Sequence, residues 1–107
     1  MHAALRMRQY ERQAVATASP AQLIAKLYDI GVSACHRGDR SKTRAVIVEL
    51  MSSLDLEAGG DLAGRLHAIY EFCLHESAAG DLSSVAELLA GLREAWQDGV
   101  LALRPAA

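Results

Sequence analysis

The chain has 107 residues, which is the size of one domain. Hydrophobic residues make up 51% and charged residues 22%, so the chain is globular and not disordered. Only 5% of the residues are aromatic, and abundant Ala and Leu favour helices over strands. The net charge of −2 is not that of a general polyanion binder. The composition therefore disfavours a multidomain enzyme, a β-sandwich and a disulfide-stapled secreted module.

Charge is distributed unevenly along the chain. Residues 1–53 contain eight Lys or Arg and four Asp or Glu, whereas residues 54–107 contain three and nine. The densest basic run consists of Arg37, Arg40, Lys42 and Arg44. A nucleic-acid site needs a larger basic stripe with exposed aromatic residues. We therefore interpret the run as a solvated helix end and loop, and predict no nucleic-acid partner.

The cysteines and the hydropathy pattern indicate a cytoplasmic protein. Cys35 and Cys73 do not form a CxxC motif and lie in apolar helical patterns, as buried thiols do. No apolar run approaches the roughly 18 residues that span a bilayer. The first residues lack the apolar segment of a secretory signal. We expect a cytoplasmic chain with no membrane insertion.

The first long helix is predicted to begin at Ser19-Pro20. Ser19 can cap the helix, Pro20 suits its first position, and Gln22 completes a capping box. Apolar and small residues then recur at three- and four-residue spacing until Gly38, which is expected to end the helix. Residues 1–18, which have no long apolar stripe, are predicted to form a short N-terminal arm or helix.

Three further helices are predicted at about 41–54, 61–77 and 82–103, separated by glycine-containing turns. The β-branched residues at 45–48 could form a strand, but a lone strand would have no partner. Short connections make consecutive helices antiparallel. The predicted fold is all-α, an antiparallel four-helix up-down bundle, with residues 19–104 as one domain behind the arm of residues 1–18.

Catalytic and metal-binding patterns are weak. His67 and His75 lie about two turns apart on one helix, and His36 follows Cys35 on another, so a metal site between helices is conceivable. The spacings typical of such sites, HxxxH, ExxH and CxxC, are missing. Three carboxylates near the Gly59-Gly60 turn lack the twelve-residue calcium pattern and suit helix capping instead: Asp55, Glu57 and Asp61. We predict no enzyme activity, no metal and no cofactor.

The apolar surface of the first helix is wider than one seam of a bundle needs, with apolar or small residues at positions 23, 24, 27, 28, 30, 31, 34 and 35. Such width indicates either fuller burial or a groove for a partner, and periodicity does not choose between them. The helical spacing of Tyr70 and Trp96 indicates core positions before ligand-stacking ones.

Four strings, in chain order, resemble the flagellar secretion chaperone FliS family over roughly residues 10–98. They are Tyr10 and Val15 followed by Thr17-Ala18-Ser19-Pro20, Gln22-Leu23-Ile24 and Leu27-Tyr28-Asp29; Ser52-Ser53-Leu54-Asp55 with Glu57 and Gly59-Gly60-Asp61-Leu62-Ala63; Leu66 with Ile69-Tyr70-Glu71-Phe72; and Leu88-Leu89 with Leu92-Arg93-Glu94-Ala95-Trp96. The segment between Asp29 and Ser52 is several helical turns shorter than in typical members. A shortened hairpin leaves open an exchange of helices between two copies, that is, a homodimer.

The resemblance implies a cytosolic, all-helical protein that is not an enzyme. Family members bind the disordered C-terminal segment of flagellin, prevent its premature polymerisation and deliver it to the export gate. The guest folds as it wraps hydrophobic grooves, and the chaperone's own arm can lie across the empty surface.

The resemblance also implies a set of partner-binding residues. Tyr10 and Val15 would anchor the arm, and the grooves would be lined by Leu23, Ile24, Leu27, Tyr28, Leu50, Leu54, Leu62, Leu66, Ile69 and Tyr70. Plain core packing is the other interpretation of each of these residues, because the same amphipathic spacing serves both. The alternative function is a shortened helical-bundle adaptor or regulator that binds another partner or self-associates.

Overall fold

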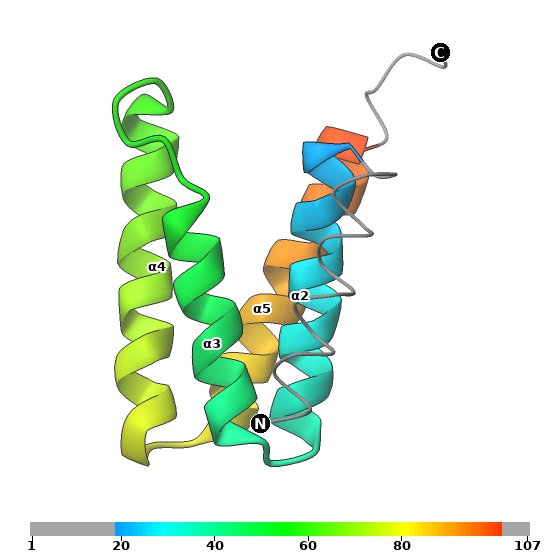
Figure 1. Ribbon diagram of the computed structural model, residues 1–107, viewed down its shortest axis with the longest axis vertical. Helices are drawn as coiled ribbons and strands as arrows, with labels where there is room; N and C mark the ends of the chain where they lie inside the picture. The colour runs from blue at the N-terminus through cyan, green and yellow to red at the C-terminus, as the bar shows by residue number, and fades with distance from the viewer. Residues whose placement is uncertain (1–18, 102–107) are drawn as a thin grey trace.

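A computed structural model describes residues 19–101, which form four α-helices and a final π-helical turn (Figure 1). The helices are α2 (Pro20–His36), α3 (Arg40–Ser52), α4 (Gly60–Ala79) and α5 (Leu82–Trp96), and the turn is η1 (Gln97–Leu101). Successive helices run antiparallel, so the predicted all-α up-down bundle is confirmed. The predicted arm, residues 1–18, lies outside the described residues.

Both ends of α2 form as the sequence predicts. The Ser19 side chain accepts a hydrogen bond from the Gln22 backbone N–H, and the Gln22 side chain accepts one from the Ser19 N–H. At the other end Gly38 has a φ of +70°, the left-handed conformation that glycine adopts without strain. Its N–H donates to the Cys35 carbonyl and the Asp39 N–H donates to the Ala34 carbonyl, which completes a Schellman motif.

Other helix ends differ from the prediction. Helix α3 stops at Ser52, not near Leu54, because the Asp55 carboxylate accepts from the N–H groups of Glu57 and Ala58 and folds the chain into a turn. Helix α4 is longer than predicted at both ends. Regular α geometry ends at Trp96 and a π turn follows, which contains Gly99, a residue of low helix propensity.

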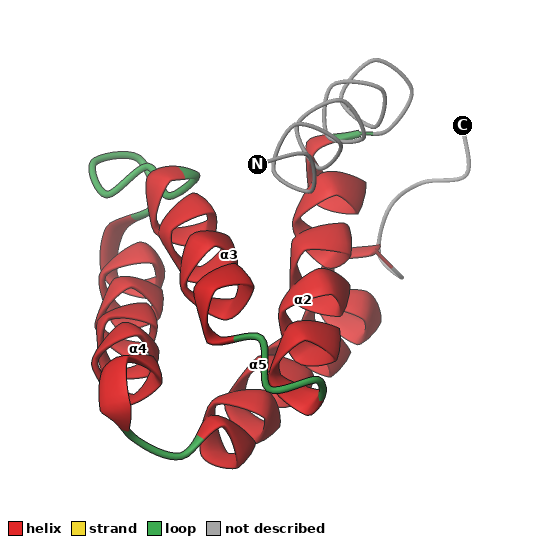
Figure 2. Cartoon of the chain, turned by 60° about the horizontal axis from the view of Figure 1, so that its bottom comes forward, coloured by secondary structure: helices red, strands yellow, loops and turns green. Residues whose placement is uncertain are grey.

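The four helices form a ring that is closed on three sides. Helix α2 packs against α5 and α3, and α3 packs against α4. Helices α4 and α5 have the fewest contacts among neighbouring helices, although only Gly80 and Asp81 separate them in the chain. Figures 1 and 2 show these two helices diverging from their shared turn, so that the α3–α4 pair and the α2–α5 pair form a V.

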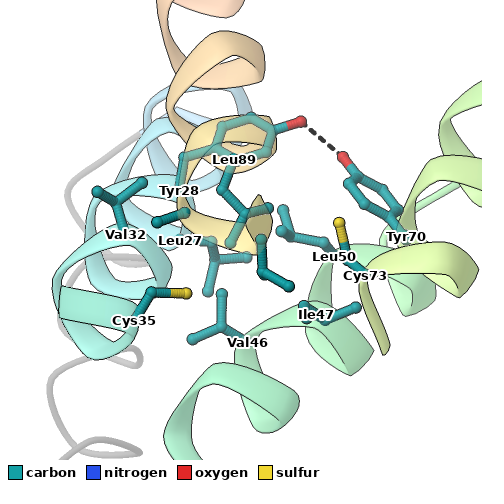
Figure 3. Packing of buried hydrophobic residues seen from close by; sticks show 12 residues of the cluster. Leu27, Tyr28, Val32, Cys35, Val46, Ile47, Leu50, Tyr70, Cys73 and Leu89 are labelled. Atoms are coloured by element: carbon teal, nitrogen blue, oxygen red, sulfur yellow. Dashed lines mark hydrogen bonds between the residues drawn. The ribbon is translucent and has the colours of Figure 1, made fainter. Parts of the chain in front are cut away.

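The core lies where all four helices meet. Its fully buried side chains come from every helix and include Tyr28, Val46, Ile47, Leu50, Tyr70, Cys73, Val85 and Leu89 (Figure 3). Gly31 allows the close approach of α2, since a Cβ there would lie 3.0 Å from the Leu89 Cδ1 and 3.1 Å from the Val46 Cγ1. The absence of a side chain at Gly31 therefore helps α2 to pack on both α3 and α5.

Two arginines of the basic run cross between helices, which the sequence interpretation as a solvated end did not anticipate. The Arg40 guanidinium donates to the carbonyl oxygens of Ser77 and Gly80. The Arg44 guanidinium donates to the Leu74 carbonyl and the Ser77 hydroxyl. Cations near a helix C-terminus offset its partial negative charge and bond its unpaired carbonyls. The run thus fixes the end of α4 to α3.

Candidate functional site

Four of the predicted partner-binding residues lie in the core. Leu27, Tyr28, Leu50 and Tyr70 are all buried and belong to one hydrophobic cluster. In this conformation their side chains stabilise the bundle and have almost no surface to offer a partner. A charge introduced at Leu27 would therefore damage the fold before it reported on binding.

The two buried tyrosines join α2 to α4. Their hydroxyl oxygens lie 2.6 Å apart in a hydrogen bond (Figure 3). Burial raises the pKa of both phenols above the ordinary value, and the shared hydrogen bond opposes this rise at Tyr28 and adds to it at Tyr70. Both hydroxyls are therefore neutral at physiological pH, and each satisfies the other in a site that excludes water.

Trp96 extends this group of rings. Its indole stands edge-on to Tyr28, with ring centroids 6.5 Å apart, and its Nε1–H donates to the Ala21 carbonyl at 2.8 Å. The indole ties the end of α5 to the first turn of α2. Trp96 thus packs against the core, as its spacing predicts.

The remaining predicted residues differ in their exposure. Ile24, Leu54, Leu66 and Ile69 are partly buried and pack on the edge of the core. Leu23 is half-buried but lies outside that cluster, and Leu62 is 68% exposed. Tyr10 and Val15 lie outside the described residues.

Exposed and half-buried apolar side chains lie on the side where α4 and α5 diverge. The opposite flanks of α4 and α5 contact other helices. On α4 the Leu74 carbonyl accepts a hydrogen bond from Arg44 of α3, and on α5 Arg93 pairs with Asp29 of α2 at 3.1 Å. Since successive helical residues are about 100° apart, the flanks of α4 and α5 turned away from these contacts face each other. We call this surface the α4–α5 face; its residues are Leu62, Leu66, Ile69, Phe72, Leu88 and Leu92.

Residues equally far from the Gly80-Asp81 turn lie at similar heights in the antiparallel pair. Ile69 is thus opposite Leu92, and Phe72 is level with Leu88 and Leu89. Phe72 and Leu88 are 49% and 36% exposed. Large apolar side chains that are exposed on one face are typical of a surface that binds a partner.

Sequence reasoning missed Phe72, Leu88 and Leu92 as candidate site residues. All three are named only within the strings that resemble the family. Phe72 falls three residues after Ile69 on the same flank, a spacing that could have marked it. The decisive property, that no helix covers this flank among residues 19–101, cannot be read from spacing.

The concave region beside α2 and α3 has a different character. A shallow depression of about 250 Å³ lies between α2 and the start of α3, lined by Lys26, Asp29, Ile30, Ser33, Arg37 and Lys42. Its lining is mostly charged, and the Arg37 guanidinium is held by the Ser33 hydroxyl at 2.6 Å. It does not provide the apolar area that a folding segment needs.

Within residues 19–101 no three His, Cys, Asp or Glu side chains are grouped as metal ligands. Cys35 and Cys73 are both buried free thiols, and burial raises the pKa of Cys73 to about 11. His67 instead pairs with Glu71 at 2.9 Å, one turn along α4. None of the described helices has both the length and the apolar character of a membrane span.

Comparison with known families identifies the family of this chain. The model of the family described as flagellar protein FliS matches residues 36–102, more than half of the chain. This chain belongs to the FliS family. No curated protein and no solved structure matches it. The matched region contains α3, α4 and α5, and so the whole α4–α5 face.

Family membership assigns the general role. A FliS-family chain is a flagellar chaperone, and the family is not one of enzymes. The candidate site of this chain is therefore best considered as a surface that holds another flagellar protein.

Proposed function

We propose that this FliS-family chain binds the disordered C-terminal segment of flagellin in the cytoplasm, prevents its premature polymerisation and delivers it for export. The α4–α5 face supports this proposal most directly. It offers three large exposed apolar side chains, Leu62, Phe72 and Leu88, beside half-buried leucine and isoleucine. The guest segment would add a helix to the open side of the ring.

The energetics of such an addition are adequate. A segment that folds on binding loses about 2–5 kcal/mol to ordering, and association costs roughly 4–15 kcal/mol more. At about 25 cal/mol per Å² of apolar surface, roughly 250–800 Å² of burial offsets these costs. A helix of ordinary length laid along the α4–α5 face can bury that area.

The decisive experiment is a calorimetric titration of the C-terminal segment of the same organism's flagellin, with circular dichroism to follow its helicity. Saturable binding with a gain in helicity is expected for the wild type. Phe72→Asp and Leu88→Asp place a charge on the face without touching the buried core, so each should weaken binding at least about tenfold.

Val48→Asp is the matched control, because Val48 is an exposed aliphatic residue on α3, away from the face. It should change affinity less than about twofold. Unchanged affinity in both Phe72→Asp and Leu88→Asp, with the fold intact, would contradict the site assignment. A wild type that binds no flagellin segment but sediments as a dimer would support the self-associating adaptor instead.

A further inference from the structure

The border of the α4–α5 face carries charge of one sign along α5. Glu87, Glu94 and Asp98 follow each other at seven- and four-residue spacing, which places them on one side of the helix and its extension. All three are exposed, and none has an ion-pair partner among residues 19–101. Along α5 the apolar flank with Leu88 and Leu92 is therefore edged by carboxylates.

Other carboxylates of the chain are used within the bundle. Asp29 pairs with Arg93, Glu71 pairs with His67, and Asp39 and Asp81 accept backbone N–H groups at helix starts. The structure gives no such internal role to Glu87, Glu94 and Asp98. Their shared feature is their position beside the exposed apolar surface.

Small residues occupy the surface of α5 between the carboxylates and the leucines. A Cβ added at Gly91 would meet no atom within 4 Å, so nothing in the described chain requires glycine there. With Ala95 one turn later, Gly91 lets another helix approach the α5 backbone closely. The α4 border of the face carries charges of both signs, since Arg65 lies between Asp61 and Glu76.

The two halves of the bundle differ in charge as well. Residues 60–101 contain seven acidic and two basic residues, whereas residues 20–52 contain three acidic and five basic ones. A cationic partner is thus attracted to the α4–α5 side and repelled from the α2–α3 side. Charge complementarity of this kind fixes the location and direction of docking more than it adds affinity.

We propose that the occupant of the α4–α5 face is an amphipathic helix of the guest whose apolar stripe is flanked by Lys or Arg on the side that meets α5. This inference rests on the proposed function and specifies the chemistry of its guest. The apolar stripe packs on Phe72, Leu88 and Ile69, and the cationic flank lies along Glu87, Glu94 and Asp98. Binding is therefore sensitive to salt.

The test compares two double charge reversals with the same change in net charge. Glu87→Lys/Glu94→Lys alters the α5 border, and Glu49→Lys/Glu57→Lys alters exposed carboxylates on α3 and in the 53–59 connection. Each is titrated with the C-terminal flagellin segment at low and high ionic strength. The border variant should weaken binding about tenfold at low salt and less at high salt, while the control stays within about twofold.

Two synthetic helical peptides test the charge preference without flagellin. Both have the same leucine stripe, and one carries Lys flanks while the other carries Glu flanks. The Lys peptide should bind the wild type and lose affinity for Glu87→Lys/Glu94→Lys; the Glu peptide should bind poorly. Equal binding of both peptides, or equal effects of the two charge reversals, would overturn the inference.

The wild-type titration separates the two proposals. If the flagellin segment binds but its affinity is indifferent to the α5 border and to salt, the charged-flank inference fails and the proposed function stands. If the wild type does not bind the segment at any ionic strength, the proposed function fails. A dimer of the free protein that Phe72→Asp dissociates would identify a second copy as the occupant and overturn the inference.

Discussion

The two ends of the bundle are built differently. At the end that holds the turns at 37–39 and 80–81, all four helices contribute buried side chains, among them Cys35, Val46, Cys73 and Val85. At the opposite end Leu50 is buried, but more of the apolar residues are only partly buried: Ile24, Met51, Leu54, Leu66 and Leu92. Short turns and the Arg40 and Arg44 bonds hold the first end together. The longer 53–59 connection at the second end joins only α3 to α4.

This comparison shows how a small chain can be both stable and able to bind. The closed end supplies the core that a domain of this size needs. The open end and the α4–α5 face leave apolar surface that no described helix covers. The Tyr28–Tyr70 hydrogen bond lies between the two regions and joins α4 to α2 midway along both helices.

The largest expected effect comes from a matched pair of leucine truncations. Leu89→Ala removes a fully buried side chain from the closed region and should lower the free energy of unfolding by about 2–5 kcal/mol. Leu62→Ala, on the exposed face, should change it by less than about 0.5 kcal/mol. Urea denaturation measures both, and similar losses at the two sites would break the comparison.

A smaller effect is expected at the tyrosine pair. Tyr28→Phe and Tyr70→Phe each leave one buried hydroxyl without its partner, so each should cost about 1–2 kcal/mol of stability. The double variant should lose less than the sum of the two, because it removes both hydroxyls together. Strict additivity in a double-mutant cycle would show that the hydrogen bond does not couple α2 to α4.

The smallest effect is a loss of stability at alkaline pH. Burial raises the pKa of Cys73 from its ordinary value of 9.0 to about 11, so above pH 9 the unfolded chain releases this proton before the folded one does. Stability should therefore fall by about 1 kcal/mol between pH 8 and pH 10. Cys73→Ala should reduce this slope in denaturation curves. An unchanged slope would mean that the thiol is not shielded in the closed region.

Local sequence signals predicted the helices well. Ser19 with Gln22, the glycine at Gly38 and the Gly80-Asp81 pair all act at the helix ends where they were expected. These signals are reliable because capping depends on residues within one turn of each other. The end of α3 was predicted wrongly because the Asp55 turn competes locally with the helix. Hydrophobic periodicity does not reveal such a turn.

The binding surface was predicted only in part. Ile24, Leu54, Leu62, Leu66 and Ile69 retain exposed or partly exposed surface, whereas Leu27, Tyr28, Leu50 and Tyr70 are enclosed. All of them follow the same amphipathic spacing. The exposure of Phe72 and Leu88 and the cross-helix bonds of Arg40 and Arg44 depend on which helices lie next to each other.

By itself, the sequence determined that this chain is helical, where its helices begin, and which family it resembles, because each of these follows from residue identity and short-range order. The tertiary structure alone decided which apolar side chains are core and which are surface. The physical reason is that burial depends on the neighbouring helix: α3 packs along one flank of α4, whereas α5 diverges from the other flank, which none of the described helices covers.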